Sequence, residues 1–515
     1  MIGLTRNLLR LVGIAHTLAR HDALFLLEQL DIAPGVAWMA RATSLRKAPG
    51  RPGQRLARAL VALGPTFIKL GQVLATRSDL LGEEIAADLT ELQDRLSPFP
   101  YGQAKAILEQ EFGQPLDTLF QSFDQAPVAA ASIAQVHFAI TTDGREVAVK
   151  VLRPDIEKAF ERDLDLFRWV ADMVEATRPE LRRLKPAESV RTFEETVHFE
   201  MDLRFEAAAA AELGENFEDD PTFRVPEVDW RRTGQRVLTT ERVHGCRFDD
   251  REAILAAGHD PKAIVATAAA AFFNQVFRDG LFHGDLHPGN MFVQKDGTLA
   301  AVDFGIMGRL DRVTARHLGE MLLAFLTRDY RRAAEVHFEA GWVPADQSVD
   351  SFTQACRSIA EPILGLPQNE ISMARLLAQL FRITEFFQME AQPQLLLLQK
   401  TMLVAEGAGR RLNPDTNMWI LAQPLIEEWM IENLGPQARV LDAVEDLGDG
   451  LRRLPRTLSG LETALQDLNS QGLKVHPDTL RGLRDGGPGG SPGRGGVPLW
   501  VAIGLAGALI VAIVL

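Results

Sequence analysis

Cysteine is nearly absent from this sequence. The chain of 515 residues contains two cysteines, Cys246 and Cys356, which lie far apart and form no Cys-x-x-Cys pair. This excludes a disulfide framework and a zinc or iron–sulfur site built on cysteine, and it favours a reducing compartment. We expect both thiols to be inert residues of the core.

An excess of positive charge is absent too. The chain carries 55 Lys and Arg residues against 69 Asp and Glu residues, a net charge of −14. Broad nucleic-acid binding needs a basic footprint, so no nucleic-acid partner is expected. Apolar residues make up 46% of the chain and charged residues 24%, which is ordinary for a globular protein. The length predicts about three domains.

The first 60 residues differ from the rest, because they hold nine basic residues and three acidic ones. Apolar residues recur there at helical spacing, at Leu4, Leu8, Leu11, Val12, Ala15 and Leu18. Such a basic amphipathic helix can lie on an anionic membrane or dock on the body of the protein, and both alternatives stay open. It is not a secretory signal, because arginines interrupt the apolar residues.

The C-terminal end combines a linker with an apolar segment. Residues 485–498 read DGGPGGSPGRGGVP, a flexible composition, and the uncharged residues 499–515 follow them. As a helix, the uncharged segment would reach about 26 Å, near the lower limit for crossing a hydrocarbon core. With Trp500 at an interfacial position and arginines before it, we expect a transmembrane helix that anchors a cytoplasmic body, at a bacterial inner membrane. A buried helix of the body is the alternative. Gly504 and Ala508 could pair two such helices into a homodimer.

The middle of the chain mixes two periodicities. Helical period is found over 64–120, 155–213, 261–278 and about 311–484. Strand patterns are found over 237–241, over 136–152 around an Asp143-Gly144 turn, and over 291–302 around an Asp296-Gly297 turn. A part that contains strands followed by a helical part predicts the α+β class.

Lys150 stands alone on one face of an apolar strand. Strand alternation turns Val147, Val149 and Val151 to the opposite face. Taken alone, such a lysine is more often a surface residue than a functional one. The motifs that follow it in the chain change that interpretation.

Two downstream motifs are typical of phosphoryl transfer. Residues 283–290 read HGDLHPGN, of the form H-x-D-x-x-x-x-N, and Asp303 lies in an Asp-Phe-Gly triplet. A carboxylate and an amide oxygen can hold the Mg²⁺ that neutralises a nucleotide triphosphate, so we expect Asn290 and Asp303 to be the metal ligands. Asp285 is expected to orient a hydroxyl group or a water molecule. With Lys150 upstream, the motifs predict a protein-kinase-like core that binds ATP or ADP with Mg²⁺.

The glycine-rich loop that ordinary kinases place before the first hairpin is missing. Its position is occupied by Ala129, Ala130, Ala131, Ser132, Ile133, Ala134, Gln135 and Val136. Alanine permits fewer backbone conformations than glycine. We expect this alanine-rich loop to contact the nucleotide, and to change nucleotide preference or transfer competence.

Together these motifs resemble those of the UbiB family of atypical kinases, which support ubiquinone biosynthesis. The resemblance covers roughly residues 60–410. Beside the motifs above, it rests on Lys69-Leu70-Gly71-Gln72, which matches the family's K-x-G-Q motif, and on Glu200-Met201-Asp202, which matches E-x-D. The HGDLHPGN loop also resembles that of small-molecule kinases, which favours a non-protein acceptor.

The resemblance implies a role for each motif residue. Lys150 would contact the nucleotide phosphates and pair with Glu206, and Asp285 would be the catalytic-loop aspartate. Lys69, Gln72 and Glu200 would belong to an N-terminal extension that covers the protein-substrate cleft. With Asp202, these three would be catalytic residues beside Asp285 and Lys150. The alanine-rich loop, Lys150, Glu206 and Glu241 would bind the nucleotide, and Asn290 and Asp303 the metal. Family members are membrane-associated.

Helix geometry predicts how the acidic residues divide. On a continuous helix, Asp202 and Glu206 are four residues apart and share a face, whereas Glu200 lies about 200° around the axis from Asp202. Glu200 and Glu206 therefore need different partners, and Lys69 and Lys150 are the candidates. A solvated acidic helix is the alternative.

We therefore predict a two-lobed, protein-kinase-like α+β fold. Its expected parts are a helical N-terminal extension (1–125), an N-lobe (126–243), a C-lobe (244–410), a helical C-terminal extension (411–484), a linker (485–498) and a transmembrane helix (499–515). The expected activity is ATP hydrolysis or phosphorylation of a small or lipid-like molecule in support of quinone biosynthesis. Membrane lipid, quinone precursors and other quinone-biosynthesis proteins are the expected partners. The alternatives are a nucleotide-gated scaffold or lipid-binding pseudokinase, and a protein kinase.

Overall fold

A computed structural model describes residues 2–23, 48–75, 82–90, 97–177, 186–362, 383, 386–389, 393–414, 421 and 424–430. The chain divides into one unit of residues Met1–Leu425 with Leu499–Leu515 and a second unit of Ile426–Pro498. All elements named below belong to the first unit. The expected linker over 485–498 and transmembrane helix over 499–515 lie outside the described residues, as does most of the extension over 411–484. Among the described helices, none is long and apolar enough to cross a membrane.

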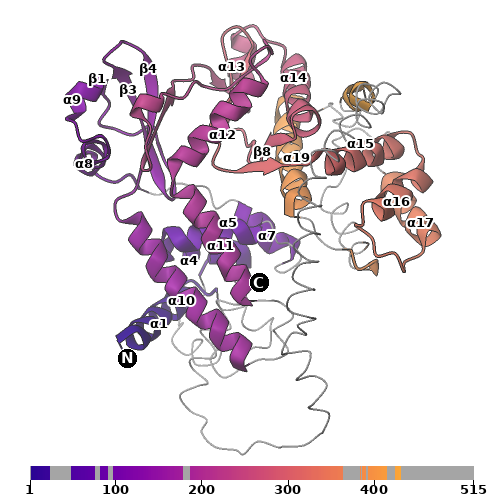
Figure 1. Cartoon of the computed structure of the whole chain (residues 1–515), viewed down its shortest axis with the longest axis horizontal. Helices are drawn as coiled ribbons and strands as arrows, with labels where there is room; N and C mark the ends of the chain where they lie inside the picture. Colours follow the sequence, from indigo (N-terminus) through magenta and orange to yellow (C-terminus); the bar gives the residue numbers. More distant parts are fainter. Residues whose placement is uncertain are drawn as a thin grey trace, which may run out of the picture. The chain divides into compact units, whose positions relative to one another are not determined.

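One group of helices carries the K-x-G-Q motif. It consists of α1 (Ile2–Arg20), α4 (Pro52–Leu63), α5 (Pro65–Ala75), α7 (Glu83–Thr90) and α10 (Ile156–Thr177) (Figure 1). Leu11, Ile14 and Leu18 of α1 are buried, and Nε of Arg10 donates to Oδ1 of Asp163 on α10 at 2.9 Å. Of the two alternatives for the N-terminal helix, the structure shows the docked one.

The first sheet is formed by β1 (Phe120–Phe123), β2 (Ala129–Ala130), β3 (Ala134–Thr141), β4 (Glu146–Leu152) and β6 (Val237–Glu241). Its order is β1-β3-β4-β6, with β2 paired to β3, and the pairings are antiparallel. The predicted β3–β4 hairpin is confirmed, and Gly144 closes its turn at a φ of 86°. The strand β1, however, lies inside the segment 1–125 that was expected to be helical. Four residues are too few to reveal a strand period in the sequence.

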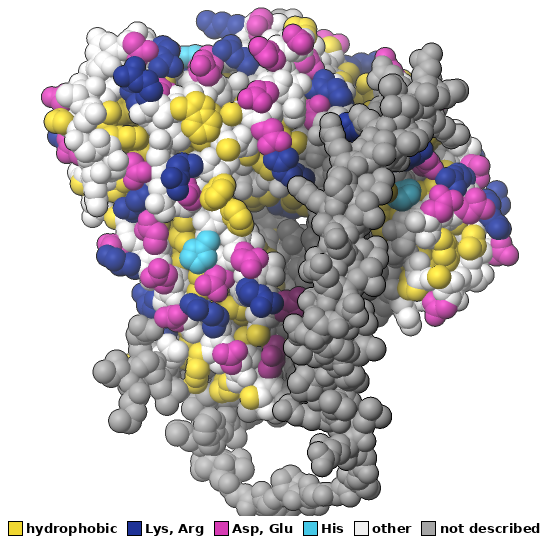
Figure 2. All heavy atoms as spheres, viewed as in Figure 1, with side chains coloured by type: hydrophobic (Ala, Val, Ile, Leu, Met, Phe, Trp, Pro, Cys, Tyr) yellow, Lys and Arg dark blue, Asp and Glu magenta, His cyan; other side chains and the backbone are white. Residues whose placement is uncertain are grey.

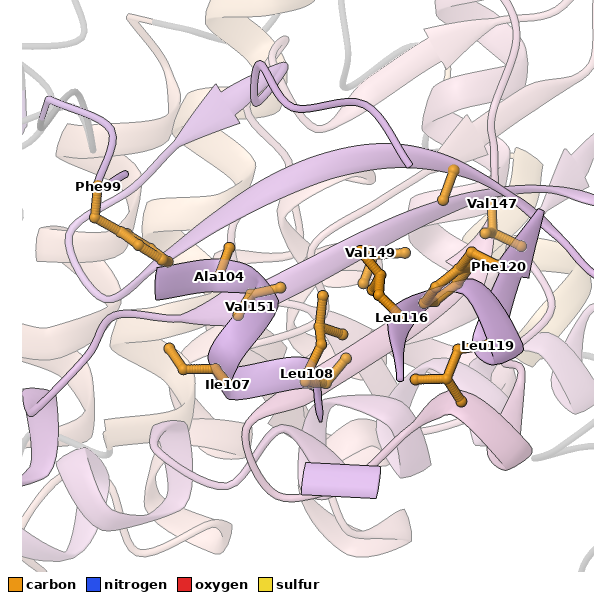
Figure 3. Packing of buried hydrophobic residues seen from close by; sticks show 12 residues of the cluster. Phe99, Ala104, Ile107, Leu108, Leu116, Leu119, Phe120, Val147, Val149 and Val151 are labelled. Atoms are coloured by element: carbon orange, nitrogen blue, oxygen red, sulfur yellow. The ribbon is translucent and has the colours of Figure 1, made fainter. Parts of the chain in front are cut away.

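One face of this sheet packs against α8 (Tyr101–Phe112) and α9 (Leu116–Leu119). Val147, Val149 and Val151 are buried there among the apolar side chains of the two helices (Figure 3). The helix α8 ends where Gly113 takes a left-handed φ of 63° and donates its N–H to the carbonyl oxygen of Glu109. Since the three valines occupy this face, Lys150 points to the other face, as strand alternation predicts.

The predicted helical segment 155–213 is divided into α10, α11 (Pro186–Glu200) and α12 (Leu203–Asn216). Asp202 is not helical: it is the N-cap of α12, and its Oδ1 accepts the backbone N–H of Arg204 at 3.1 Å. The prediction that Asp202 and Glu206 share a face of one continuous helix is therefore wrong. An aspartate that caps a new helix is favoured locally over one in a helix interior.

The C-terminal part holds two small sheets. One has the order β5-β10-β9-β7 and is formed by β5 (Phe223–Arg224), β7 (Cys246–Arg247), β9 (Met291–Val293) and β10 (Leu299–Ala301). The other pairs β8 (Leu281–His283) with β11 (Met307–Arg309). The hairpin predicted over 291–302 is confirmed as β9 and β10, which pair antiparallel.

Helices α13 (Arg251–Ala256), α14 (Pro261–Phe273) and α19 (Pro393–Leu412) pack against these small sheets, whereas α15 (Arg312–Leu326), α16 (Tyr330–Glu339) and α17 (Val349–Ala360) pack on one another (Figure 1). A π-helical turn, Asn274–Arg278, continues α14 toward β8, so the helix predicted over 261–278 is confirmed with a widened last turn. Charged side chains of both signs are interspersed over the described part of the face shown in Figure 2.

The two cysteines are free thiols. Cys356 is buried beside Tyr330 and Phe352, as expected of a core residue. Cys246 is only half-buried, at the start of β7, where its Sγ lies 3.6 Å from the Val293 carbonyl oxygen. The prediction of a core thiol therefore holds for Cys356 alone.

Candidate active site

Lys150 on β4 joins three parts of the chain. Its Nζ lies 2.8 Å from Oε1 and 2.9 Å from Oε2 of Glu206, and 2.9 Å from Oδ1 of Asp303. Glu206 belongs to the first turn of α12, and Asp303 follows β10. The ion pair expected between Lys150 and Glu206 is therefore present. Charge-assisted bonds of this length hold the sheet, α12 and the Asp-Phe-Gly triplet together.

Burial and charge together determine the ionisation of this group. Burial alone would lower the pKa of Lys150, but the carboxylates of Asp303 and Glu206 raise the pKa above its usual value. Burial raises the pKa of Glu206 to about 7, although Lys150 opposes this. Burial would also raise the pKa of Asp303, but the charge of Lys150 lowers it well below its usual range. Asp303 is therefore ionised at neutral pH, as a cation ligand must be.

The hairpin brings the two expected metal ligands together. Met291 pairs with Ala301 across β9 and β10, and Val302 donates its N–H to the carbonyl oxygen of Asn290 at 2.9 Å. Asp303 comes next and takes a left-handed φ of 64°. A residue other than glycine uncommonly adopts a positive φ, although aspartate does so more often than most, and such backbone conformations concentrate at functional sites.

The donor groups at this position suit Mg²⁺. Nδ2 of Asn290 donates to the carbonyl oxygen of Asp285 at 3.2 Å, and this orientation leaves Oδ1 of Asn290 for a cation. Mg²⁺ is commonly held by one or two protein ligands, with substrate phosphates and water completing its shell. No three His, Cys, Asp or Glu side chains in the described part of the chain gather closely enough to form an all-protein cage.

A buried histidine holds the catalytic loop in place. The N–H of Asp285 donates to Nδ1 of His283 at 3.0 Å, so the proton of the neutral ring sits on Nε2, which lies 3.2 Å from the Val302 carbonyl oxygen. Burial lowers the pKa of His283 and favours this neutral form. The π-helical turn supplies Gln275, whose Oε1 accepts the N–H of His283 at 3.0 Å. His283 is thus structural and links the loop to the strand before Asp303.

The carboxylate of Asp285 has a partner that the sequence analysis missed. Nζ of Lys400 on α19 lies 3.3 Å from Oδ1 of Asp285, and Nε2 of His287 lies 3.8 Å from Oδ2. A signal was present in the sequence, because Lys400 is a lone charge in the run LLLLQKTMLV. Lysine is rarely placed in such apolar surroundings without a partner.

The K-x-G-Q lysine is buried in an ion pair. Nζ of Lys69 on α5 lies 2.6 Å from Oε2 of Glu200 at the end of α11, and their side chains are 10% and 11% exposed. Phe67, Leu70 and Leu74 of α5 are buried, as their spacing predicts. Gln72 lies one helical turn after Lys69 and is half-buried. Glu200 and Glu206 therefore have different partners, as predicted, because a helix break and not a helical angle separates them.

Two residues expected in the site form ion pairs with arginines. Asp202 caps α12 and pairs with Arg204, with Oδ2 2.6 Å from Nη2. Both carboxylate oxygens of Glu241 accept from Nη2 of Arg224, at 2.7 and 2.8 Å, in an exposed ion pair. In the structure Asp202 and Glu241 thus pair with arginines, and their expected parts in the site stay predictions.

The alanine-rich loop is a β2–β3 hairpin. Ala129 pairs with Val136 and Ala130 with Gln135, and the N–H of Ala131 donates to the Ala134 carbonyl oxygen at 2.8 Å. Ser132, Ala134 and Gln135 are buried. The side chains of Ala129, Ala130, Ala131, Ile133 and Val136 are not buried, and the assignment of this loop as a nucleotide contact stays a prediction.

Two polar residues fix the hairpin in place. Gln135 accepts the N–H of Phe99 on Oε1 at 2.9 Å and donates Nε2 to the Phe99 carbonyl oxygen at 3.3 Å. Arg153, at the end of β4, donates Nε and Nη2 to the Ala131 carbonyl oxygen at 3.0 and 2.8 Å. The sequence offered no signal for this arginine, because it lies outside every motif.

The chain is similar to a set of curated relatives. A Marinobacter nauticus protein described as "Probable protein kinase UbiB" is 43% identical over 424 residues, which cover 82% of this chain and 78% of that protein. A Vibrio vulnificus protein with the same description is 45% identical over 429 residues, covering 82% and 79%. Among solved structures, the Mycobacterium tuberculosis protein Rv3197 in complex with erythromycin is 25% identical, with a TM-score of 0.51, over 70% of this chain and 90% of that chain.

Two family models match the chain. The ABC1 atypical kinase-like domain matches residues 91–337, which include the sheet, Lys150, Glu206, Asp285 and Asp303. The UbiB helical domain matches residues 356–417, which include α19 and Lys400 and extend across the boundary expected at residue 410. The relatives share one description, and it agrees with both family models, with the motifs and with their geometry. The chain therefore belongs to the UbiB family of ABC1 atypical kinase-like proteins.

Proposed function

We propose that this protein binds Mg-ATP and either hydrolyses it or transfers its terminal phosphoryl group to a small or lipid-like acceptor. Family membership is consistent with a place in ubiquinone biosynthesis. The observation that carries the proposal is the contact of Lys150 with both Glu206 and Asp303, at 2.8 and 2.9 Å. Burial of a lysine between two carboxylates carries a desolvation cost that its ion pairs must offset, and such perturbed charges concentrate at functional sites.

Each residue of the site has a defined part in this proposal. When bound, Mg²⁺ neutralises the phosphate oxygens and stabilises the charge that develops during transfer. Asp303 and Asn290 hold the metal, and Lys150 contacts the phosphates while Glu206 orients it. Asp285 accepts the proton of the attacking hydroxyl or water, and His283 holds the Asp285 backbone in position.

Protein kinase activity is the second candidate, because the curated relatives are described as probable protein kinases. Two features favour a non-protein acceptor over a protein substrate: the K-x-G-Q helix and the missing glycine-rich loop. A nucleotide-gated scaffold is the third candidate. Phosphate release with and without detergent or quinone precursors separates the three. Turnover without a labelled protein supports the proposal, a labelled protein supports the second candidate, and binding without turnover supports the third.

The substitution Asp303→Asn tests nucleotide binding. It removes the negative charge from the metal site, so the affinity for Mg-ATP measured by calorimetry should fall at least ~10-fold. The matched control is Asp165→Asn, because Asp165 is an exposed carboxylate on α10 paired with Arg168. An unchanged affinity in Asp303→Asn would count decisively against a kinase-like nucleotide site.

We also propose that residues 499–515 anchor the protein at the inner membrane, with its body in the cytoplasm. Its proposed partners are membrane lipid, quinone precursors and other quinone-biosynthesis proteins. Support comes from the uncharged segment and its glycine-rich linker in the sequence. Deletion of residues 486–515 should release the body into the soluble fraction with an unchanged melting temperature. If the truncated protein stays with membranes after a high-salt wash, the anchor lies elsewhere in the chain.

A further inference from the structure

The helix α19 lies against the catalytic loop. It packs on α14 and on β11, which is paired with the strand that leads into that loop. Its C-terminal end is held by Arg251, whose Nε donates to the Leu412 carbonyl oxygen at 3.2 Å. On its inner face, Leu398 and Thr401 are buried. This placement brings Lys400 to Asp285 across 115 residues of sequence.

Glycine at position 284 permits this close approach. A Cβ atom there would lie 3.0 Å from Cδ2 of Leu397 and 2.9 Å from Cγ2 of Ile306. Both distances are below ordinary van der Waals contact. A larger residue would crowd the side-chain ends of Leu397 and Ile306, which would have to shift, and Lys400 lies one helical turn after Leu397.

The charges of the site are divided between two lysines. Lys150 is engaged by Glu206 and Asp303, whereas Lys400 faces Asp285 at 3.3 Å, with their side chains 28% and 30% exposed. The second basic neighbour of Asp285, His287, is farther away at 3.8 Å. Lys400 is therefore the nearer cation to the carboxylate that would accept the substrate proton.

We propose that Lys400 is a positioning residue of the active site, through which α19 orients the Asp285 carboxylate for phosphoryl transfer. This inference rests on the proposed function. In the transfer step, the attacking oxygen forms a bond to the γ-phosphorus while the bond from that phosphorus to the ADP oxygen breaks, and the proton of the attacking group passes to Asp285. Lys400 holds the Asp285 carboxylate in place during this step.

The test separates positioning from binding. Lys400→Met should lower kcat for ATP turnover about 10²-fold, a loss typical of a misplaced catalytic group, while the Kd for Mg-ATP measured by calorimetry changes less than about 3-fold. Lys400→Arg keeps the charge and should recover most of the turnover. The control is Arg411→Met, because Arg411 is exposed on the same helix, and it should match the parent.

A second variant approaches the same contact from the loop. Gly284→Ala leaves the charge of Lys400 intact but crowds the Leu397 side chain of α19, so it should lower kcat in the same direction as Lys400→Met, by a smaller factor and with an unchanged Kd. Melting temperatures of all variants identify any that fail to fold, and Lys400→Gln then replaces Lys400→Met.

Three outcomes would overturn the inference. They are a parental kcat in Lys400→Met, a parallel loss of kcat and Mg-ATP affinity, and an arginine variant as impaired as the methionine variant. Asp285→Asn distinguishes the inference from the proposed function. If Asp285→Asn abolishes turnover and Lys400→Met does not, the inference fails alone. If the parent protein binds no Mg-ATP, or binds it without turnover, the proposed function fails and the inference with it.

Discussion

At the scale of single residues, the two lysine–glutamate pairs are the features that distinguish this site from a charged surface. Lys69 and Glu200 are almost fully buried at an Nζ–Oε2 distance of 2.6 Å. Lys150 and Glu206 are comparably buried at 2.8 Å. Removal of one partner from a buried pair leaves an uncompensated charge, which is far more costly than the loss of an exposed pair.

The Lys69–Glu200 pair should therefore show strong energetic coupling. Lys69→Ala and Glu200→Ala should each change Mg-ATP turnover or affinity, and the double-mutant cycle should give a coupling above about 0.5 kcal/mol. The control cycle uses Lys158 and Asp155, which form a pair of the same 2.6 Å length but are 79% and 71% exposed. Additive effects in the Lys69 cycle would show that the pair does not act on the nucleotide site.

At the scale of elements, the break between α11 and α12 separates the two pairs. Asp202 caps α12, and its own side chain bonds to Arg204. The helix that carries Glu206 thereby starts at a defined residue, and Glu200 stays on the preceding helix. This assigns Asp202 a structural part where the family resemblance implied a catalytic one.

Replacement of this cap distinguishes the two roles. Asp202→Ala should lower the free energy of unfolding by about 1 kcal/mol, because a backbone N–H of α12 loses its acceptor. The affinity for Mg-ATP should stay within about 3-fold of the parent. Asp202→Asn keeps a capping oxygen and should retain most of the stability. A large loss of turnover in a stably folded Asp202→Asn protein would restore the catalytic role.

The β2–β3 hairpin is the other element with a functional consequence. Ala130→Gly should loosen the strand β2, because glycine is destabilising in a strand by roughly 0.5–1 kcal/mol. The hairpin would then approach the flexible glycine-rich form, so we expect an altered ratio of ATP to ADP affinity and self-phosphorylation. Ala126→Gly, in the exposed segment before β2, is the control. Nucleotide affinities and phosphate incorporation equal to those of the parent would show that this hairpin does not touch the phosphates.

At the scale of the whole molecule, stability should depend on pH because histidines are buried in uncharged form. His337 on α16 is enclosed by Trp342 and Phe352, and its Nδ1 lies 2.7 Å from the Ala333 carbonyl oxygen. Burial lowers the pKa of His337, and it also lowers the pKa of His283. The folded state therefore binds fewer protons than the unfolded state below the usual histidine pKa.

This difference determines the direction of the effect. The contribution of the uncharged histidines to the free energy of unfolding is fully present above about pH 6.5, the usual histidine pKa. It is lost as the pH falls below this value. His337→Phe keeps an aromatic ring but cannot titrate, so between about pH 7.5 and about pH 5.5 it should lose about 1 kcal/mol less stability than the parent. Denaturant midpoints at both pH values provide the measurement. The control is His198→Phe on the surface of α11, and a pH dependence of His337→Phe equal to the parent would contradict the argument.

The amino-acid sequence alone determined the local features of this protein. The β3–β4 and β9–β10 hairpins, the strand β6, the inward face of α5 and the isolation of Lys150 on β4 all follow from period and turn chemistry, which act over a few residues. The chemical class followed from residue types, because a lysine, an aspartate and an asparagine in that order are typical of phosphoryl transfer.

Only the tertiary structure decided which charges meet. Lys150 contacts Glu206 across 56 residues and Asp303 across 153 residues, and Lys400 contacts Asp285 across 115 residues. No periodicity extends over such distances, since these contacts depend on how helices and sheets pack. The family resemblance placed Asp202, Glu241 and Gln135 in the site, whereas in the structure Asp202 caps α12, Glu241 pairs with Arg224 and Gln135 bonds to Phe99. The cap is a local feature, but the burial of Gln135 depends on Phe99, 36 residues away in the chain.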